Sequence, residues 1–123
     1  MRARGFTLIE VLVTMAIVAM VLTLAVPRYF GNVDRVREDV LREDLHVMRD
    51  AIDKFYADKN HYPAELGELV TEKYLRAIPV DPFTKSAGTW QVVQPEDETM
   101  GIVASVKSGA QDTARDGTKV RDW

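Results

Sequence analysis

The first part of the chain is dominated by one unbroken apolar run, FTLIEVLVTMAIVAMVLTLAV, from Phe6 to Val26. As a helix that rises 1.5 Å per residue, a run of about 20 residues spans about 30 Å, the thickness of the hydrocarbon core of a bilayer. Glu10 is the single charged residue within this run. The pattern therefore predicts a membrane-spanning helix over residues 6–27.

After Pro27 the pattern changes to that of an amphipathic helix, in which apolar residues recur at helical spacing among many charged ones. The apolar positions are Val33, Val36, Val40, Leu41, Leu45, Met48, Ile52 and Phe55. On the polar side, Glu38 lies four residues before Arg42, and Asp50 four before Lys54, so each pair can form an ion pair across one helical turn.

The two segments are predicted to form a single helix from about Thr7 to about Asp58. Proline kinks a helix without always ending it, so Pro27 can be accommodated. Asn60 and Pro63 are typical residues for the end of this helix.

The rest of the chain predicts smaller elements. PAELGELV, over residues 63–70, indicates a short helix with Pro63 in its first turn, and Pro79 and Pro82 indicate an extended linker. The β-branched stretches 89–93 and 101–107 flank the acidic PEDET sequence and predict a hairpin. A loop-like tail follows. The fold class is therefore α+β, with a long N-terminal helix packed on a small antiparallel sheet.

Charge and composition limit the classes of function. The formal net charge is −3, and loss of Arg2 and Arg4 with a leader would make it more negative by two, which argues against a broad nucleic-acid-binding face. A soluble body of under about 100 residues usually needs a disulfide, a metal or neighbouring subunits. The chain has no cysteine, so a metal or assembly remains as the expected support.

Glu10 is the most informative residue, because a carboxylate inside an apolar span costs roughly 2.5 to 3.5 kcal/mol and requires a partner. If residues 1–5 are a leader cut after Gly5, Phe6 acquires a free α-amino group one helical turn before Glu10. Two alternatives remain open. Glu10 could snorkel from an ordinary signal-anchor helix, or a secretory signal peptide could be cut after Ala25, although Pro27 would then follow the scissile bond closely.

Three stretches of the chain carry a family resemblance. GFTLIEVLV, from Gly5 to Val13, with Pro27 at its offset, resembles the class III leader and mature start of type IV pilins and of type II secretion pseudopilins. FYADKNHYP, from Phe55 to Pro63, and IPVDPFT, from Ile78 to Thr84, are similar to the major pseudopilin of the general secretion pathway G type. The resemblance covers roughly two-thirds of the chain.

The resemblance implies a pilin-like fold and a set of roles. The leader is residues 1–5, the transmembrane and polymerisation helix is 6–27, and the periplasmic domain is 28–123, divided into 28–58, 59–88 and 89–123. A prepilin peptidase would cut between Gly5 and Phe6 and methylate Phe6. Glu10 would then pair with the Phe6 amine of a neighbouring subunit, and Pro27 would shape the assembly helix. No catalytic residue is expected.

The tail departs from the family pattern. Major pseudopilins commonly end in a Gly- and Asp-rich loop that binds calcium, whereas here Asp112 and Asp116 are the candidate ligands. Calcium takes six to eight oxygen ligands, so main-chain oxygens and water would have to complete the site. The alternatives are a solvated acidic tail without a cofactor, and docking of Trp123 on the sheet in place of a metal.

The function that the resemblance implies is a structural one. The chain would be a subunit of a type II secretion pseudopilus, a helical homopolymer that leaves the inner membrane to drive protein export. Its partners would be minor pseudopilins, a platform protein, an assembly ATPase and the outer-membrane secretin. The alternative is a type IV pilin for adhesion, twitching or DNA uptake. A weaker one is a signal-anchored periplasmic enzyme or binding module.

Overall fold

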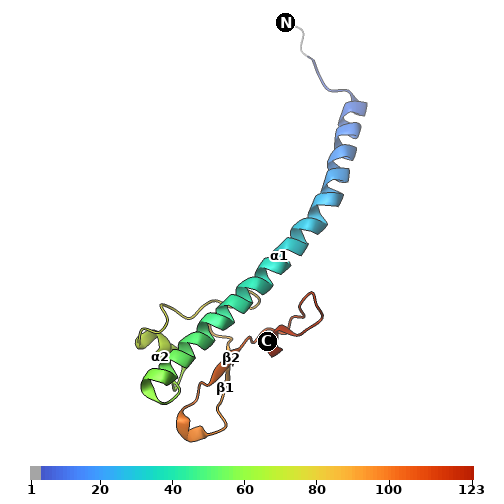
Figure 1. The fold of residues 1–123 in the computed structure, drawn as a ribbon. Coiled ribbons are helices and arrows are strands. Elements are labelled where there is room, and N and C mark those ends of the chain that lie inside the picture. The colour runs from blue at the N-terminus through green and yellow to red at the C-terminus, as the bar shows by residue number, and fades with distance from the viewer. Residues whose placement is uncertain (1–3) are drawn as a thin grey trace. The chain divides into compact units, whose positions relative to one another are not determined.

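The computed structural model describes residues 4–123, so Met1, Arg2 and Ala3 of the predicted leader lie outside the described residues. Its elements, in order, are α1 (Leu8–Lys59), α2 (Leu66–Thr71), β1 (Gln91–Val93), the 3₁₀ turn η1 (Glu98–Met100), β2 (Ser105–Lys107) and the 3₁₀ turn η2 (Val120–Asp122). Figure 1 shows the long helix and the hairpin. The predicted α+β class is confirmed.

Helix α1 matches the predicted single helix at both ends. Thr7 caps its start, because the Thr7 hydroxyl accepts a hydrogen bond from the Glu10 N–H at 3.3 Å. Pro27 lies inside the helix and does not end it. After Lys59 the chain turns at Asn60, whose φ of 59° is left-handed and ends the helix as expected.

The contacts of the chain divide it into two compact units, one up to Asp34 and one from Arg35 to Trp123. In the first unit the described side chains are exposed apart from the half-buried Val33. The second unit has its own hydrophobic core. We describe each unit by itself.

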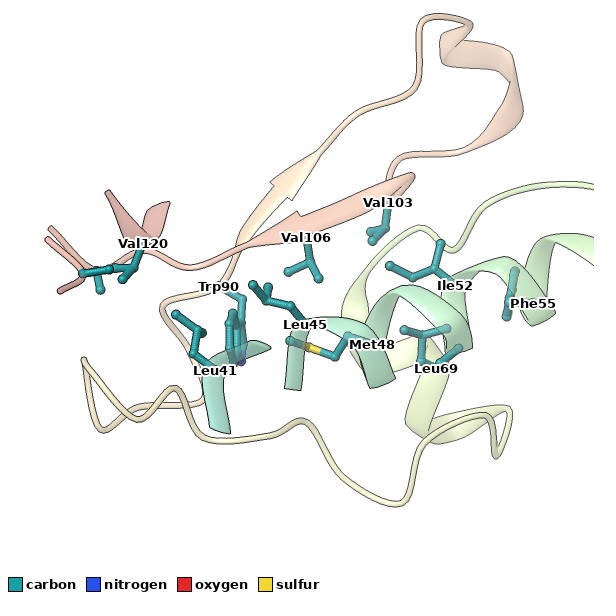
Figure 2. Packing of buried hydrophobic residues seen from close by; sticks show 13 residues of the cluster. Leu41, Leu45, Met48, Ile52, Phe55, Leu69, Trp90, Val103, Val106 and Val120 are labelled. Carbon is teal, nitrogen blue, oxygen red and sulfur yellow. The ribbon is translucent and has the colours of Figure 1, made fainter. Parts of the chain in front are cut away.

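The core of the second unit forms between one side of α1 and the segments that follow it (Figure 2). Its buried members are Leu41, Leu45, Met48, Ala51, Ile52 and Phe55 of α1, Leu69 of α2, and Trp90, Val103, Val106, Ala110, Ala114 and Val120. The α1 residues recur every three or four positions, which places them on one side of the helix. Full burial of each large side chain stabilises the fold by about 1.5 to 3 kcal/mol.

The predicted apolar side of the amphipathic part of α1 is wrong at the start of that part, around residues 36–40. Val36 and Val40 are 60% and 42% exposed, whereas Glu38 is only 5% exposed. Glu38 also does not pair with Arg42 as predicted, because the loop before η2 covers it and supplies Arg115 as its partner. The predicted Asp50–Lys54 ion pair is confirmed at 2.8 Å.

Helix α2 begins at Leu66, three residues later than predicted, and Pro63 is not part of it. The carbonyl of Pro63 instead accepts hydrogen bonds from the N–H groups of Val103 at 2.9 Å and Ile102 at 3.3 Å. The same pairing explains why the second strand is shorter than predicted. Residues 101–103 lie against the segment after α1, and only Ser105–Lys107 pair with β1.

The hairpin itself is confirmed. β1 and β2 form a two-stranded antiparallel sheet within the described residues, with Val92 opposite Val106. The acidic connection between them contains η1, which Asp97 caps by accepting the Thr99 N–H at 3.0 Å.

The segment rich in proline folds around a buried carboxylate. Asp81 is fully buried, and one of its carboxylate oxygens accepts the Phe83 N–H at 2.8 Å while the other accepts the Ser108 hydroxyl. The Trp90 indole N–H donates to the Pro79 carbonyl at 2.8 Å. These bonds fix the 79–84 turn to the hairpin and to the start of the tail.

Candidate functional site

The predicted processing and assembly residues lie at the start of α1. Gly5 and Phe6 precede the helix, and Glu10 belongs to its first turn. Phe6 is 87% exposed, and Glu10 is also exposed. An acidic side chain in a first turn is favourable, because the N-terminal end of the helix dipole is positive.

Phe6 and Glu10 line the same shallow hollow on the surface, together with Ile9, Val13 and Thr14. Around it, the Thr14 hydroxyl donates to the main-chain carbonyl of Glu10 at 2.7 Å. The Glu10 side chain is exposed and accepts none of this bond. The structure therefore brings together the two residues that the sequence predicts to act as a pair, on a surface that a second molecule can reach.

The helix around Glu10 is apolar and uncovered. Its exposed large apolar residues include Leu8, Ile9, Leu12, Met15, Ile17, Met20, Val21, Leu22 and Leu24. Within residues 4–123, α1 is the one helix long and apolar enough to cross a membrane by length and composition, and its apolar window is entirely unburied. Such a surface needs a bilayer or other helices around it. Pro27 lies within α1, and its role in assembly stays a prediction.

The candidate calcium residues lie in the loop that follows β2. One carboxylate oxygen of Asp116 accepts both the N–H of Thr118, at 3.0 Å, and its hydroxyl, at 2.6 Å. These bonds, the hydroxyl bond foremost, hold the pKa of Asp116 below its ordinary value. Asp112 contributes its main-chain carbonyl, which accepts the Val120 N–H at 3.2 Å.

These donors fall short of a calcium site. In the part of the chain that the structure describes, no group of three or more His, Cys, Asp or Glu side chains is placed to hold a metal ion. Calcium needs six to eight oxygens, several of them from carboxylates, and Asp116 already uses its carboxylate in a turn. Calcium at Asp112 and Asp116 stays a prediction that the described donor set does not fit.

Residues that sequence reasoning missed lie on α1 opposite the same loop. Glu38, Arg42 and Arg49 each contact the segment from Val106 to Trp123. One signal was available, because Glu38 lies three residues before Leu41 and continues the three-and-four spacing of the buried apolar residues. A charged residue at a core position requires a partner, and here that partner is Arg115.

Comparison with known proteins supports one family. Residues 1–26 match the model of the prokaryotic N-terminal methylation motif. The type II secretion system core protein G of Klebsiella michiganensis is 28% identical over 92% of this chain and 89% of its own length. That of Pectobacterium carotovorum is 31% identical over 67% of this chain and 63% of its own length.

A relative with a different name also matches. The fimbrial protein EcpC of Eikenella corrodens is 27% identical over 94% of this chain and 78% of its own length. No solved structure matches the chain. The methylation motif at the start of an exposed apolar helix, with the relatives that match most of the chain, supports a membrane-anchored, type IV pilin-like protein that is most similar to the major pseudopilins.

Proposed function

We propose that this chain is the structural subunit of a type II secretion pseudopilus. One observation carries the proposal. The uncovered apolar part of α1 contains a single carboxylate, that of Glu10, and Glu10 shares an exposed hollow with Phe6. A lone charge in such a helix is costly unless a neighbour neutralises it. The relatives named type II secretion system core protein G support this function.

Processing would create the neighbour's group. Hydrolysis of the Gly5–Phe6 bond by a prepilin peptidase leaves the α-amine on Phe6, and the enzyme then methylates this amine. The amine stays cationic after a single methylation, so it can pair with a carboxylate. Phe6 is exposed and lies before the first residue of α1, and this position supports access by the peptidase.

Pairing would occur between molecules. Glu10 of one subunit would bind the Phe6 amine of the next, at a fixed step along the filament, while apolar side chains of the two helices pack together. An ion pair in this dry environment is much stronger than one in water. The pair would therefore set the axial position of each new subunit, and Pro27 would adapt the helix to its neighbours.

The part of α1 that belongs to the second unit, residues 35–59, is here named the stem. The stem offers a further contact for a second copy. The exposed part of the stem is mostly charged, but it also carries three valines that are between 40% and 60% exposed: Val36, Val40 and Val47. Their spacing of four and seven residues places them on one side of α1. In a homopolymer, these valines would pack against the neighbouring subunit.

The same proposal implies a cellular location and a set of partners. Before the leader is cut, Arg2 and Arg4 would hold the N-terminus on the cytoplasmic side of the bacterial inner membrane, so the unit from Arg35 onward would be periplasmic. Minor pseudopilins would start the filament, and a platform protein with an assembly ATPase would supply the work. The filament would push substrates through the outer-membrane secretin. The chain itself would act through contacts, not as an enzyme.

Substitution of Glu10 tests the mechanism. Glu10→Ala should abolish filament assembly but preserve membrane insertion, because removal of the charge favours insertion. Glu43→Ala, which removes an exposed carboxylate from the stem, is the matched control and should assemble normally. Sheared filaments and membrane fractions are then compared by immunoblotting. Normal filaments from Glu10→Ala would refute the pairing mechanism.

The mass of the protein extracted from membranes tests the processing step. A chain that begins at methylated Phe6 supports a pilin-like subunit. An intact Met1, or a start at Val26 after signal-peptide cleavage, would refute it and favour a signal-anchored enzyme or binding module.

A type IV pilin for adhesion, twitching or DNA uptake is the second candidate, and the fimbrial relative favours it. Both candidates share the processing and pairing chemistry. Deletion of the chain's gene separates them: loss of protein secretion supports the pseudopilin, and loss of surface fimbriae or motility supports the pilin.

A further inference from the structure

The segment Ser108–Trp123, here named the C-terminal loop, belongs to the second unit and is held against α1 by side chains of that helix. Apart from η2 and a single bridge between Thr113 and Lys119, it has no regular structure of its own. Small loop-rich bodies of this kind usually depend on a disulfide or a metal. The chain has no cysteine, so its loop needs another support.

Glu38 supplies the first support. Its side chain is almost fully buried under the loop, and its two carboxylate oxygens accept the main-chain N–H of Arg115 at 2.8 Å and the Nε–H of Arg115 at 3.3 Å. A buried carboxylate is costly unless charged or polar donors satisfy it. Arg115 therefore satisfies and neutralises the buried Glu38 carboxylate.

Arg42 and Arg49 hold the far end of the loop. The guanidinium carbon of Arg42 lies 4.1 Å from the centre of a Trp123 ring, a close cation–π contact. Arg49 donates from Nη2 to the carbonyl of Val106 at 2.9 Å and to the main-chain oxygen of Trp123 at 2.8 Å. Arg49 thus joins strand β2 to Trp123. Docking of Trp123 on the sheet was one alternative that the sequence offered, and the structure shows Trp123 packed against the core and in contact with Arg42 and Arg49 of α1.

Residues of the C-terminal loop also form hydrogen bonds with one another. The N–H of Ala114 donates to the Thr118 carbonyl at 2.7 Å, and the Trp123 indole N–H donates to the Thr118 hydroxyl at 2.8 Å. Asp116 also binds Thr118, as described above. The Thr118 carbonyl and one carboxylate oxygen of Asp116 are therefore engaged within the loop itself.

We propose that Glu38, Arg42 and Arg49, named here the clamp residues, replace calcium as the support of the C-terminal loop, so that the loop folds without a divalent cation. The three residues follow one another at spacings of four and seven, which places them on one side of α1. They contact the loop at Arg115 and at Trp123, eight residues apart. The inference concerns the folded subunit and holds whether or not the chain forms a filament.

Hydrogen exchange measured by mass spectrometry tests the proposal on the full chain in detergent micelles. Peptides from the C-terminal loop should exchange at the same rate in millimolar calcium and in excess EGTA, and the midpoint of thermal unfolding should shift by no more than about 1 °C. Protection of the loop by calcium, or a rise in the midpoint on the order of 4 to 8 °C, would overturn the proposal.

Variants test the clamp directly. Glu38→Gln and Arg42→Ala should each raise the exchange rate of the loop peptides at least about tenfold without restoring a calcium effect. Arg42→Ala removes an exposed side chain and serves where Glu38→Gln does not fold. Asp50→Ala, on the exposed side of the same helix, should leave the loop unchanged. Unchanged loop exchange in both clamp variants would refute the role of these residues.

Discussion

Glu38 and Arg115 are 77 positions apart in the sequence and are joined by two hydrogen bonds of different kinds. One comes from the main-chain N–H of Arg115, which is held in place by the loop. The other comes from its side chain, which is about half exposed. Because water screens the second contact and not the first, the two bonds should contribute unequally.

The first prediction uses this difference. Glu38→Ala should lower the free energy of unfolding by about 1 to 3 kcal/mol, because the N–H of Arg115 loses its buried acceptor. Arg115→Ala keeps that N–H and should cost less than about 1 kcal/mol. Urea unfolding of the full chain in detergent measures both. Equal losses would mean that the guanidinium group carries the contact.

Sequence patterns predicted the elements well where the pattern is local. The ends of α1, the hairpin and the buried positions from Leu41 to Phe55 follow from helical spacing, caps and β-branched stretches. Glu10 was also conspicuous, because a charge in an apolar run stands out against its neighbours, while its pairing with Phe6 and the cut after Gly5 stay predictions.

The remaining features depend on contacts between distant segments. Glu38 was predicted to pair with Arg42 on the polar side because Arg42 lies one turn away, and nothing local shows that residue 115 comes closer. Pro63 was placed in a helix because proline favours a first turn, but pairing with Val103 competes for its carbonyl. Long-range pairing decided both positions.

The second prediction concerns pH and two acidic residues of α1. Burial raises the pKa of Asp44 above its ordinary value of 3.8, and repulsion by Asp81 and Glu43 adds to this effect. Ionised Asp44 therefore opposes folding, with a penalty that is present above the raised pKa and absent below 3.8. Asp44→Asn should be more stable than the unmodified chain at neutral pH, and the difference should shrink as the pH falls.

Asp50 gives the opposite sign and serves as the control. The hydrogen bond from Lys54 lowers the pKa of Asp50, so its stabilising effect is present above 3.8 and is lost as the pH falls through the lowered pKa. Asp50→Asn should therefore be less stable than the unmodified chain at neutral pH. Urea unfolding across the acidic range distinguishes the two variants. A change of the same sign in both would contradict the assignment.

The third prediction concerns the exposed valines of the stem. Two residues advance about 200° around a helix, so the line of Val36, Val40 and Val47 lies roughly opposite the clamp residues and stays free for a second copy. Because the chain has no cysteine, Val40→Cys introduces a unique thiol. A bismaleimide should then join pairs of neighbouring filament subunits into a covalent dimer on a denaturing gel, because each subunit offers one thiol.

His46→Cys is the matched control, since His46 is exposed on another side of α1. It should give little or no covalent dimer. The dimer band of Val40→Cys should also disappear when Glu10→Ala is added, because the valines meet a neighbour only in assembled subunits. Dimer bands of equal strength from both thiols would show that the contact is not specific to the valines.

The fourth prediction compares two glycines that have left-handed backbones. Gly101 has a φ of 113°, and a Cβ at this position would lie 2.3 Å from the carbonyl oxygen of Tyr62, whereas Gly117 has a φ of 87° and open space around it. Gly117→Ala should cost only the backbone strain, about 1 kcal/mol. Gly101→Ala adds a collision with main chain that is itself fixed, because the N–H of Tyr62 donates to the Met100 carbonyl. It should therefore lower the free energy of unfolding by clearly more than Gly117→Ala does, and expose residues 101–103 to hydrogen exchange. Equal stability of the two variants would mean that the segment after α1 can move away from Gly101 at little cost, and that its pairing with Val103 contributes little to the fold.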